Sequence, residues 1–281
     1  MTGTPLDGIR LVATDLDGTL LNRSGRVGER VRASVELARQ NGVETVYLTG
    51  RPLHDAASVL GEAGLGGYLA ASNGAVVRDR QGLVLGRWTM DAELGAEISA
   101  ALRLALDGTH LGAVTEGELA LDHGFPADLA ETWRAQLGER TVEGLLAGGR
   151  VLKLLAACPG WPVGAFAEMV SALVGDRFCV TFSTERFLEI SLSSATKGAA
   201  LEVIARAAGV PLSAAACVGD MPNDLGMFDV AGLAVAVANA APTVRRRAHL
   251  VVSSNEDDGV AELIEAIVRA RGRNGAARTT S

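Results

Sequence analysis

Cysteine is scarce in this chain of 281 residues. There are three cysteines, Cys158, Cys179 and Cys217, and they lie far apart in the sequence. Their odd number and the lack of CxxC spacing fit a reducing compartment better than a disulfide framework. Residues 1–10 also lack the apolar core of a secretion signal, because Asp7 interrupts them. We therefore expect a cytoplasmic protein.

Long apolar runs and an excess of positive charge are also missing. No stretch approaches a membrane span without charged or turn residues. The net charge of -7 argues against a general binder of nucleic acids or anionic membranes. The sequence has no Walker phosphate loop, dinucleotide glycine fingerprint or HExxH zinc motif. A phosphate substrate would therefore have to be attracted by a local site and a metal. The oligomeric state is left open.

What the sequence does have is the composition of a globular protein, with 48% hydrophobic and 21% charged residues. Its two ends alternate apolar runs with helical periodicity, which favours right-handed crossovers and a doubly wound parallel sheet. The strands expected there span 9–13, 43–48, 68–71, 214–218, 233–237 and 249–252, with helices over 27–40, 197–208 and 257–270, and a hairpin joining 75–77 to 83–85.

The middle of the chain has a different pattern, in which several short strands follow one another with tight turns. This favours an antiparallel sheet. We expect strands over 111–114, 118–122, 151–157, 178–182 and 187–191, helices over 91–106 and 126–137, and a surface loop over 144–149. The predicted organisation is an α/β core (1–85 and 192–270), an inserted α/β module (86–191) and a disordered tail (271–281).

The segment Asp15-Leu16-Asp17-Gly18-Thr19 is the most informative in the chain. It follows an apolar strand, and Gly18 and Thr19 are typical of a turn. Carboxyl ends of strands in an open α/β sheet bind ligands, and Mg²⁺ prefers oxygen ligands. The segment therefore predicts an aspartate nucleophile, a neighbouring acid/base and Mg²⁺. An Asp-rich turn or the start of a calcium loop would have the same letters.

Three other polar clusters begin or follow the predicted core elements: Thr49-Gly50-Arg51, Lys197, and the segment from Gly219 to Asp224. Their chemistry is consistent with phosphoryl transfer. Lys197 is a compact charge that can hold a carboxylate and phosphoryl oxygens together. Thr49 can donate hydrogen bonds to those oxygens, and Asp220 can provide a metal ligand.

The nucleophile in this scheme is Asp15, which would form an aspartyl-phosphate. Asp17 would protonate the leaving oxygen and then activate water. Mg²⁺ would offset the repulsion between the carboxylate and the phosphate.

These four clusters, in this order, resemble the haloacid dehalogenase superfamily, and within it the Cof-type sugar-phosphate phosphatases with a type IIB cap. The resemblance implies that residues 86–191 form the cap that selects the substrate. It also implies a site in which the catalytic residues are Asp15, Asp17, Thr49 and Lys197; the substrate contacts are Thr49, Gly50, Arg51, Asn73, Lys197 and Asn223; and the Mg²⁺ ligands come from Asp15, Asp17 through its backbone carbonyl, Asp220, and Asn223 or Asp224.

Several of these residues have a second interpretation. Arg51 could contact phosphate or pair with a nearby carboxylate. Asn73 could lie at the site or serve as a turn residue, and Asn239 could approach the phosphate or cap a helix. Lys153 could point into the cleft or lie on the solvent face of an edge strand.

The sequence thus predicts a Mg²⁺-dependent phosphatase for a small phosphorylated metabolite, a sugar phosphate or a similar phosphomonoester. A phosphomutase would use the same core. Phosphatases specific for sucrose-, trehalose- or mannosylglycerate-phosphate share the fold, and a non-catalytic protein that binds phosphometabolites is a further alternative. Fold and catalytic residues alone do not identify the substrate.

Overall fold

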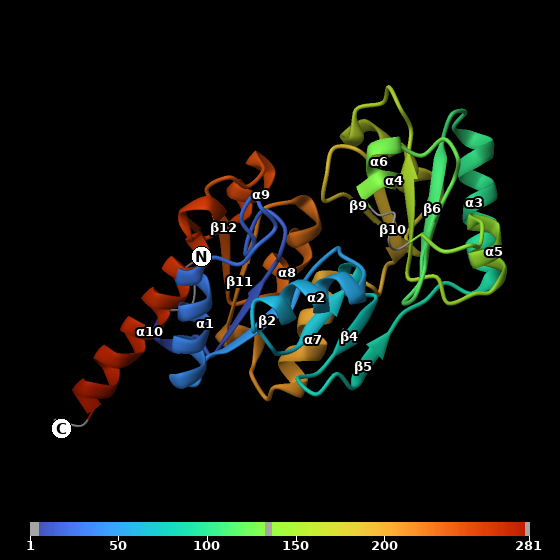
Figure 1. Ribbon diagram of the computed structural model, residues 1–281. Coiled ribbons are helices and arrows are strands. Elements are labelled where there is room, and N and C mark those ends of the chain that lie inside the picture. Colours follow the sequence, from blue (N-terminus) through green and yellow to red (C-terminus); the bar gives the residue numbers. More distant parts are fainter. Residues whose placement is uncertain (1–5, 133–136, 279–281) are drawn as a thin grey trace.

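The protein consists of two α/β units, each built on its own sheet (Figure 1). The computed structural model describes residues 6–132 and 137–278. The larger sheet has eight strands in the order β13-β12-β11-β1-β2-β3-β4-β5. Its strands are β1 (Leu11–Thr14), β2 (Glu44–Leu48), β3 (Leu69–Ala71), β4 (Val76–Arg78), β5 (Val84–Arg87), β11 (Ala215–Gly219), β12 (Leu233–Val237) and β13 (Leu250–Val252).

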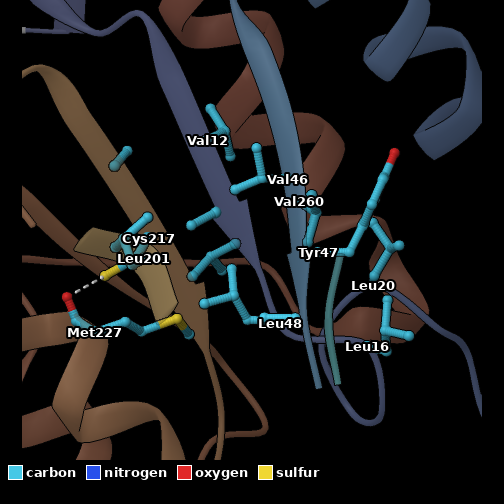
Figure 2. Packing of buried hydrophobic residues seen from close by; sticks show 14 of the residues in the cluster. Val12, Leu16, Leu20, Val46, Tyr47, Leu48, Leu201, Cys217, Met227 and Val260 are labelled. Carbon is cyan, nitrogen blue, oxygen red and sulfur yellow. Dashed lines mark hydrogen bonds between the residues drawn. The ribbon is translucent and has the colours of Figure 1, made fainter. Parts of the chain in front are cut away.

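The six strands from β13 to β3 run parallel. The apolar runs of β12, β11, β1, β2 and β3 are buried, whereas Leu250 and Val251 of the edge strand β13 are exposed. In Figure 2, Leu201 and Met227 lie on one side of the central strands, whereas Tyr47 points to the other side. The helices that provide these layers are α1 (Glu29–Gln40), α2 (Leu53–Glu62), α7 (Lys197–Ala207), α8 (Leu225–Val230), α9 (Pro242–Arg247) and α10 (Gly259–Arg278). The parallel, doubly wound core predicted from the sequence is confirmed.

The order of the strands reverses direction at β1, because the chain continues to β2 on one side and later returns to β11 on the other. Thr14 is in register with Val218 across this pair. Residues that follow β1 and β11 therefore leave the sheet side by side, at the switch point where open α/β sheets bind ligands.

The second sheet is wholly antiparallel, in the order β7-β6-β8-β10-β9. The chain enters this unit after β5 and leaves it after β10. Its strands are β6 (His110–Val114), β7 (Leu119–Leu121), β8 (Lys153–Ala157), β9 (Phe178–Thr181) and β10 (Leu188–Leu192), and its helices are α3 (Ala92–Ala105), α4 (Ala127–Thr132), α5 (Val142–Ala147) and α6 (Val163–Val174). The expected inserted α/β unit with an antiparallel sheet is confirmed.

Alternation along β8 gives this second sheet two different faces. Leu154 and Ala156 belong to a large apolar cluster shared with α3, α5 and α6, whereas Leu155 and Ala157 belong to a smaller cluster on the opposite face. Helices α3, α5 and α6 therefore cover one face, whereas the short helix α4 contributes Leu129 to the cluster on the other.

Three details differ from the sequence-based expectations. The predicted loop over 144–149 is largely helical, because Thr141 caps α5 and its apolar positions are buried at helical spacing. Of the helix expected over 126–137, the structure has Ala127–Thr132, and 133–136 lie outside the described residues. Leu137 is not helical, because it forms an isolated β-bridge with Leu119.

The last helix continues through the predicted tail as far as Arg278, and 279–281 lie outside the described residues. Arg271 donates a hydrogen bond to the carbonyl oxygen of Ile9 at 2.9 Å, which ties this extension to the core. Within residues 6–132 and 137–278, no helix combines the length and apolar character needed to cross a bilayer.

Candidate active site

Polar residues converge where the parallel strands end. Asp15 follows β1, Thr49 follows β2, and Asp220 follows β11. All three side chains are buried, with Asp15 5% exposed and Thr49 fully enclosed. Lys197, the first residue of α7, is also fully buried. The structure thus brings together residues from four predicted clusters that are up to about 200 positions apart in sequence, because parallel strands end at one edge.

Lys197 connects two carboxylates inside the protein. Its Nζ donates to Asp15 Oδ1 and to Asp224 Oδ1, both at 2.6 Å. Burial opposes the charge on Lys197, but Asp15 and Asp224 outweigh that effect and raise its pKa. Lys197 is therefore protonated and fixes the orientation of the Asp15 carboxylate.

Asp220 and Asp224 are held by the turn that follows β11. Asp224 Oδ2 accepts hydrogen bonds from the backbone N–H groups of Asp220 (2.8 Å) and Met221 (3.0 Å). Asp220 Oδ1 accepts from Thr19 Oγ1 at 3.0 Å. Gly18 has φ +76°, and a Cβ there would lie 2.3 Å from Asp220 Oδ2. Glycine is thus required twice at this position, for the backbone conformation and for the space.

The donor set fits a hard divalent cation. Carboxylate oxygens of Asp15, Asp220 and Asp224 lie within 4.8 Å of one another. Burial raises the pKa of Asp15 well above its usual range, although Lys197 lowers it. Burial, together with Asp224, raises the pKa of Asp220 to about 7. One lysine faces three carboxylates, so a further positive charge would stabilise the cluster, and Mg²⁺ prefers such oxygen ligands.

Asp17, the second carboxylate of the first motif, does not join this cluster through its side chain. Its side chain is 53% exposed and forms a bidentate ion pair with Arg51, at 2.6 and 2.7 Å. The sequence left Arg51 between a phosphate contact and a partner for a carboxylate. In this structure it pairs with Asp17, at the mouth of the site.

The segment after β3 lines the site with backbone in the left-handed region. Asn73 has φ 58° and is 3% exposed, and its Oδ1 accepts from Asn223 Nδ2 at 3.1 Å. Asn73 Nδ2 and Asn223 Oδ1 are buried without a hydrogen-bond partner among the described residues. Such orphaned groups are costly unless a ligand satisfies them. Asn73 is therefore a turn residue that is hydrogen-bonded to Asn223, which lines the cavity described below.

Thr49 and Asn239 stabilise the loops around these groups. Thr49 Oγ1 accepts from the backbone N–H of Arg51 at 3.1 Å, which leaves its hydroxyl proton able to donate. Asn239 does not cap a helix; its Nδ2 donates to the carbonyl oxygen of Gly18 at 2.8 Å, and its Oδ1 accepts from Asn255 N. It thereby holds the loop that follows β1.

A cavity of about 540 Å³ lies between the two sheets. Its floor includes Asp15, Asp17, Arg51, Asp220 and Asn223, and its other side comes from the second sheet, including Val114, Leu119, Leu155, Lys153, Phe187 and Glu189. Its volume is in the usual range for sites that bind small molecules.

Lys153 points into this cavity and not to an outer face of the sheet. Its side chain is 5% exposed and is ion-paired with Glu189, and its Nζ donates to the carbonyl oxygen of Gly50 at 2.6 Å. Glu189 also accepts from Ser183 Oγ at 3.0 Å. The sequence did not identify Glu189, because its partner lies 36 positions away on another strand. The signal available in the sequence was the position of Glu189, a charged residue within the apolar strand β10.

The fold and the site together define a class of protein: a doubly wound hydrolase with an aspartate at the switch point of the core sheet and an inserted second unit above it. The chain belongs to the haloacid dehalogenase-like hydrolase family, whose model matches residues 12–264.

Individual relatives extend over nearly the whole chain. The 5-amino-6-(5-phospho-D-ribitylamino)uracil phosphatase YwtE of Bacillus subtilis is 28% identical, over 92% of this chain and 98% of its own. A haloacid dehalogenase-like hydrolase from B. subtilis has a similar structure, with a TM-score of 0.81 and 24% identity, covering 92% of this chain and 99% of its own. The subclass IIB sugar phosphatase BT4131 gives a TM-score of 0.78 at 18% identity, with 91% and 98% covered. The expected family is thus confirmed, and the overall fold is similar to that of a subclass IIB phosphatase.

Proposed function

We propose that the protein is a Mg²⁺-dependent phosphatase that hydrolyses a small phosphomonoester through an aspartyl-phosphate on Asp15. Membership in a hydrolase family with phosphatase relatives supports phosphoric monoester hydrolysis. The observation that carries the nucleophile assignment is the contact of Asp15 with Lys197, which presents the carboxylate toward an open cavity beside two further carboxylates. Residues 86–191 act as the cap, and the cytoplasm remains the expected compartment.

In the first step, a carboxylate oxygen of Asp15 forms a bond to phosphorus as the bond from phosphorus to the leaving oxygen breaks. Lys197 holds Asp15 Oδ1, so the carboxylate cannot rotate away from the substrate. The ammonium also offsets the negative charge that gathers on the phosphoryl oxygens. Mg²⁺ held by Asp15, the Asp17 carbonyl, Asp220 and Asn223 or Asp224 would supply the remaining positive charge.

Asp17 transfers the protons in both steps. It donates a proton to the leaving oxygen, and then accepts one from the water that hydrolyses the intermediate and restores Asp15. In the free protein Asp17 is paired with Arg51. A phosphoryl group at the site would compete for Arg51 and free the Asp17 carboxyl to face the leaving oxygen.

The remaining polar residues position the phosphoryl group. Thr49 and the backbone around Gly50 donate to its oxygens. Asn73 and Asn223 have one unpartnered polar atom each, an amide donor and a carbonyl acceptor. The donor suits a phosphoryl oxygen, and the acceptor suits a cation or its bound water.

The test is phosphate release from an aryl phosphate with Mg²⁺, for the wild type and for Asp15→Asn. We expect the amide to lower kcat by about 10⁴-fold or more, because it removes the nucleophile. Asp176→Asn, an exposed aspartate at a distance from the cavity, is the matched control and should retain the wild-type rate. Full turnover by Asp15→Asn would refute the assignment. A phosphomutase would instead move the phosphoryl group between positions of a sugar without net release.

A further inference from the structure

The part of the cavity that the second unit lines is largely apolar. Val114, Leu119, Leu129, Leu155 and Phe187, called the cap wall below, all line it. Four of these side chains belong to the small apolar cluster on the face of the second sheet opposite α3, α5 and α6, and Leu129 of α4 packs against that cluster. Phe187 also packs against Phe125, with ring centroids 6.2 Å apart and planes tilted by 50°. The cap wall is therefore already assembled in this structure.

The polar side chains near the cap wall already have partners. Lys153 and Glu189 pair with each other, and Ser183 donates to Glu189. The Thr184 hydroxyl accepts from the backbone N–H of Arg186 at 3.1 Å, which leaves it a single O–H donor for a ligand. A sugar would bring several hydroxyl groups, each of which loses water on binding and needs a new partner. An apolar ring needs none.

Lys153 adds one directional contact. An ammonium group has three donors, and in the described part of the chain two of them meet Gly50 O and Glu189 Oε1. The third donor can reach one acceptor on the edge of a ligand ring. The cap thus offers a broad apolar surface and a single charged donor.

We propose that this phosphatase selects phosphate esters whose leaving group is a flat apolar ring, best a heteroaromatic ring with one hydrogen-bond acceptor, and disfavours polyhydroxylated sugar phosphates. The inference rests on the proposed function, because it identifies the substrate class of the same site. The cavity of about 540 Å³ accommodates a phosphoryl group and a ring of that kind.

The experiment compares kcat/KM for benzyl phosphate, 3-pyridylmethyl phosphate and glucose 6-phosphate, each divided by the value for acetyl phosphate. Acetyl phosphate has a leaving group too small to cover the cap wall, so it reports the catalytic residues. We expect both ring esters to exceed glucose 6-phosphate by about tenfold or more, the range in which apolar pockets discriminate. The pyridyl ester should exceed the benzyl ester. A preference for glucose 6-phosphate would overturn the inference.

Two variants locate the effect in the cap wall. Phe187→Ser, and Leu129→Gln at a half-buried position where folding is less at risk, should each lower the ratio of benzyl to acetyl phosphate by about tenfold. Leu104→Ser, on the outer surface of α3 and 90% exposed, is the control and should leave the ratio unchanged. An unaltered ratio in both wall variants would refute the proposed subsite. If the wild type hydrolyses none of these substrates, acetyl phosphate included, the phosphatase assignment is refuted, and the inference with it.

Discussion

At the scale of single residues, the ion pair between Asp17 and Arg51 shows what local sequence patterns do not predict. Asp15, Thr49, Lys197 and Asp220 were predictable because each lies at the end of an apolar strand or the start of a helix. The pairing of Asp17 with Arg51 was one of two alternatives, since 34 positions separate them. Local patterns report which elements form, but not which side chains from different elements meet.

Gly18 gives a test at this scale. We expect Gly18→Ala to weaken Mg²⁺ binding by about 10- to 100-fold, as for other residues that orient a metal ligand, because the new Cβ would displace Asp220. The measurement is Mg²⁺ titration by calorimetry.

Gly25→Ala is the matched control for this substitution. Gly25 has a similar φ of +68°, but its Cβ would meet nothing within 4 Å. Both variants should lose about 1–2 kcal/mol of stability from backbone strain, whereas Gly25→Ala should bind Mg²⁺ like the wild type. Equal Mg²⁺ affinities for the two variants would rule out a role of Gly18 in placing Asp220.

At the scale of elements, the close approach of α7 and α8 positions Lys197. A Cβ on Gly198 would lie 2.4 Å from the carbonyl oxygen of Gly226, whereas a Cβ on Gly226 would find its nearest neighbour at 3.4 Å. Substitution of glycine by alanine should therefore change the free energy of unfolding in opposite directions at the two positions. Neither effect is visible in the sequence, where both residues are simply glycines within helical segments.

We expect Gly198→Ala to lower the free energy of unfolding by about 1–3 kcal/mol through overpacking, and to lower kcat because α7 carries Lys197. Gly226→Ala should raise stability by about 0.5–1 kcal/mol, since alanine favours the helix. Urea unfolding and phosphate release measure the two effects. Destabilisation of similar size in both variants would contradict the asymmetry.

The second sheet also shows that local sequence patterns predict the elements but not what each face of a sheet contacts. Its strands were predictable from their apolar runs, but the direction of each face was not, because alternation alone does not say which face the helices cover. From the sequence alone, the side chain of Lys153 could therefore point either into the cavity or to solvent. The structure resolves this by covering Leu154 and Ala156 with helices and leaving Lys153 and Leu155 toward the core unit.

At the scale of the whole molecule, a cation held by the cluster of buried carboxylates would couple its binding to folding. Asp15, Asp220 and Asp224 come from segments that start more than 200 positions apart, so the unfolded chain has no such site. A ligand that binds only the folded state stabilises it by RT ln(1 + [L]/Kd). The order of the strands, and not any single element, creates this linkage.

We therefore expect Mg²⁺ at about 100 times its Kd to raise the free energy of unfolding by about 2.7 kcal/mol, and EDTA to remove the gain. Asp220→Asn should abolish most of the Mg²⁺ effect, because it replaces one of the three clustered carboxylates. Asp176→Asn, exposed in the second unit, should keep it in full. Urea unfolding with and without Mg²⁺ gives the comparison. An equal gain in Asp220→Asn and the wild type would show that the ion binds elsewhere, and the carboxylate cluster would then owe its charge balance to Lys197 alone.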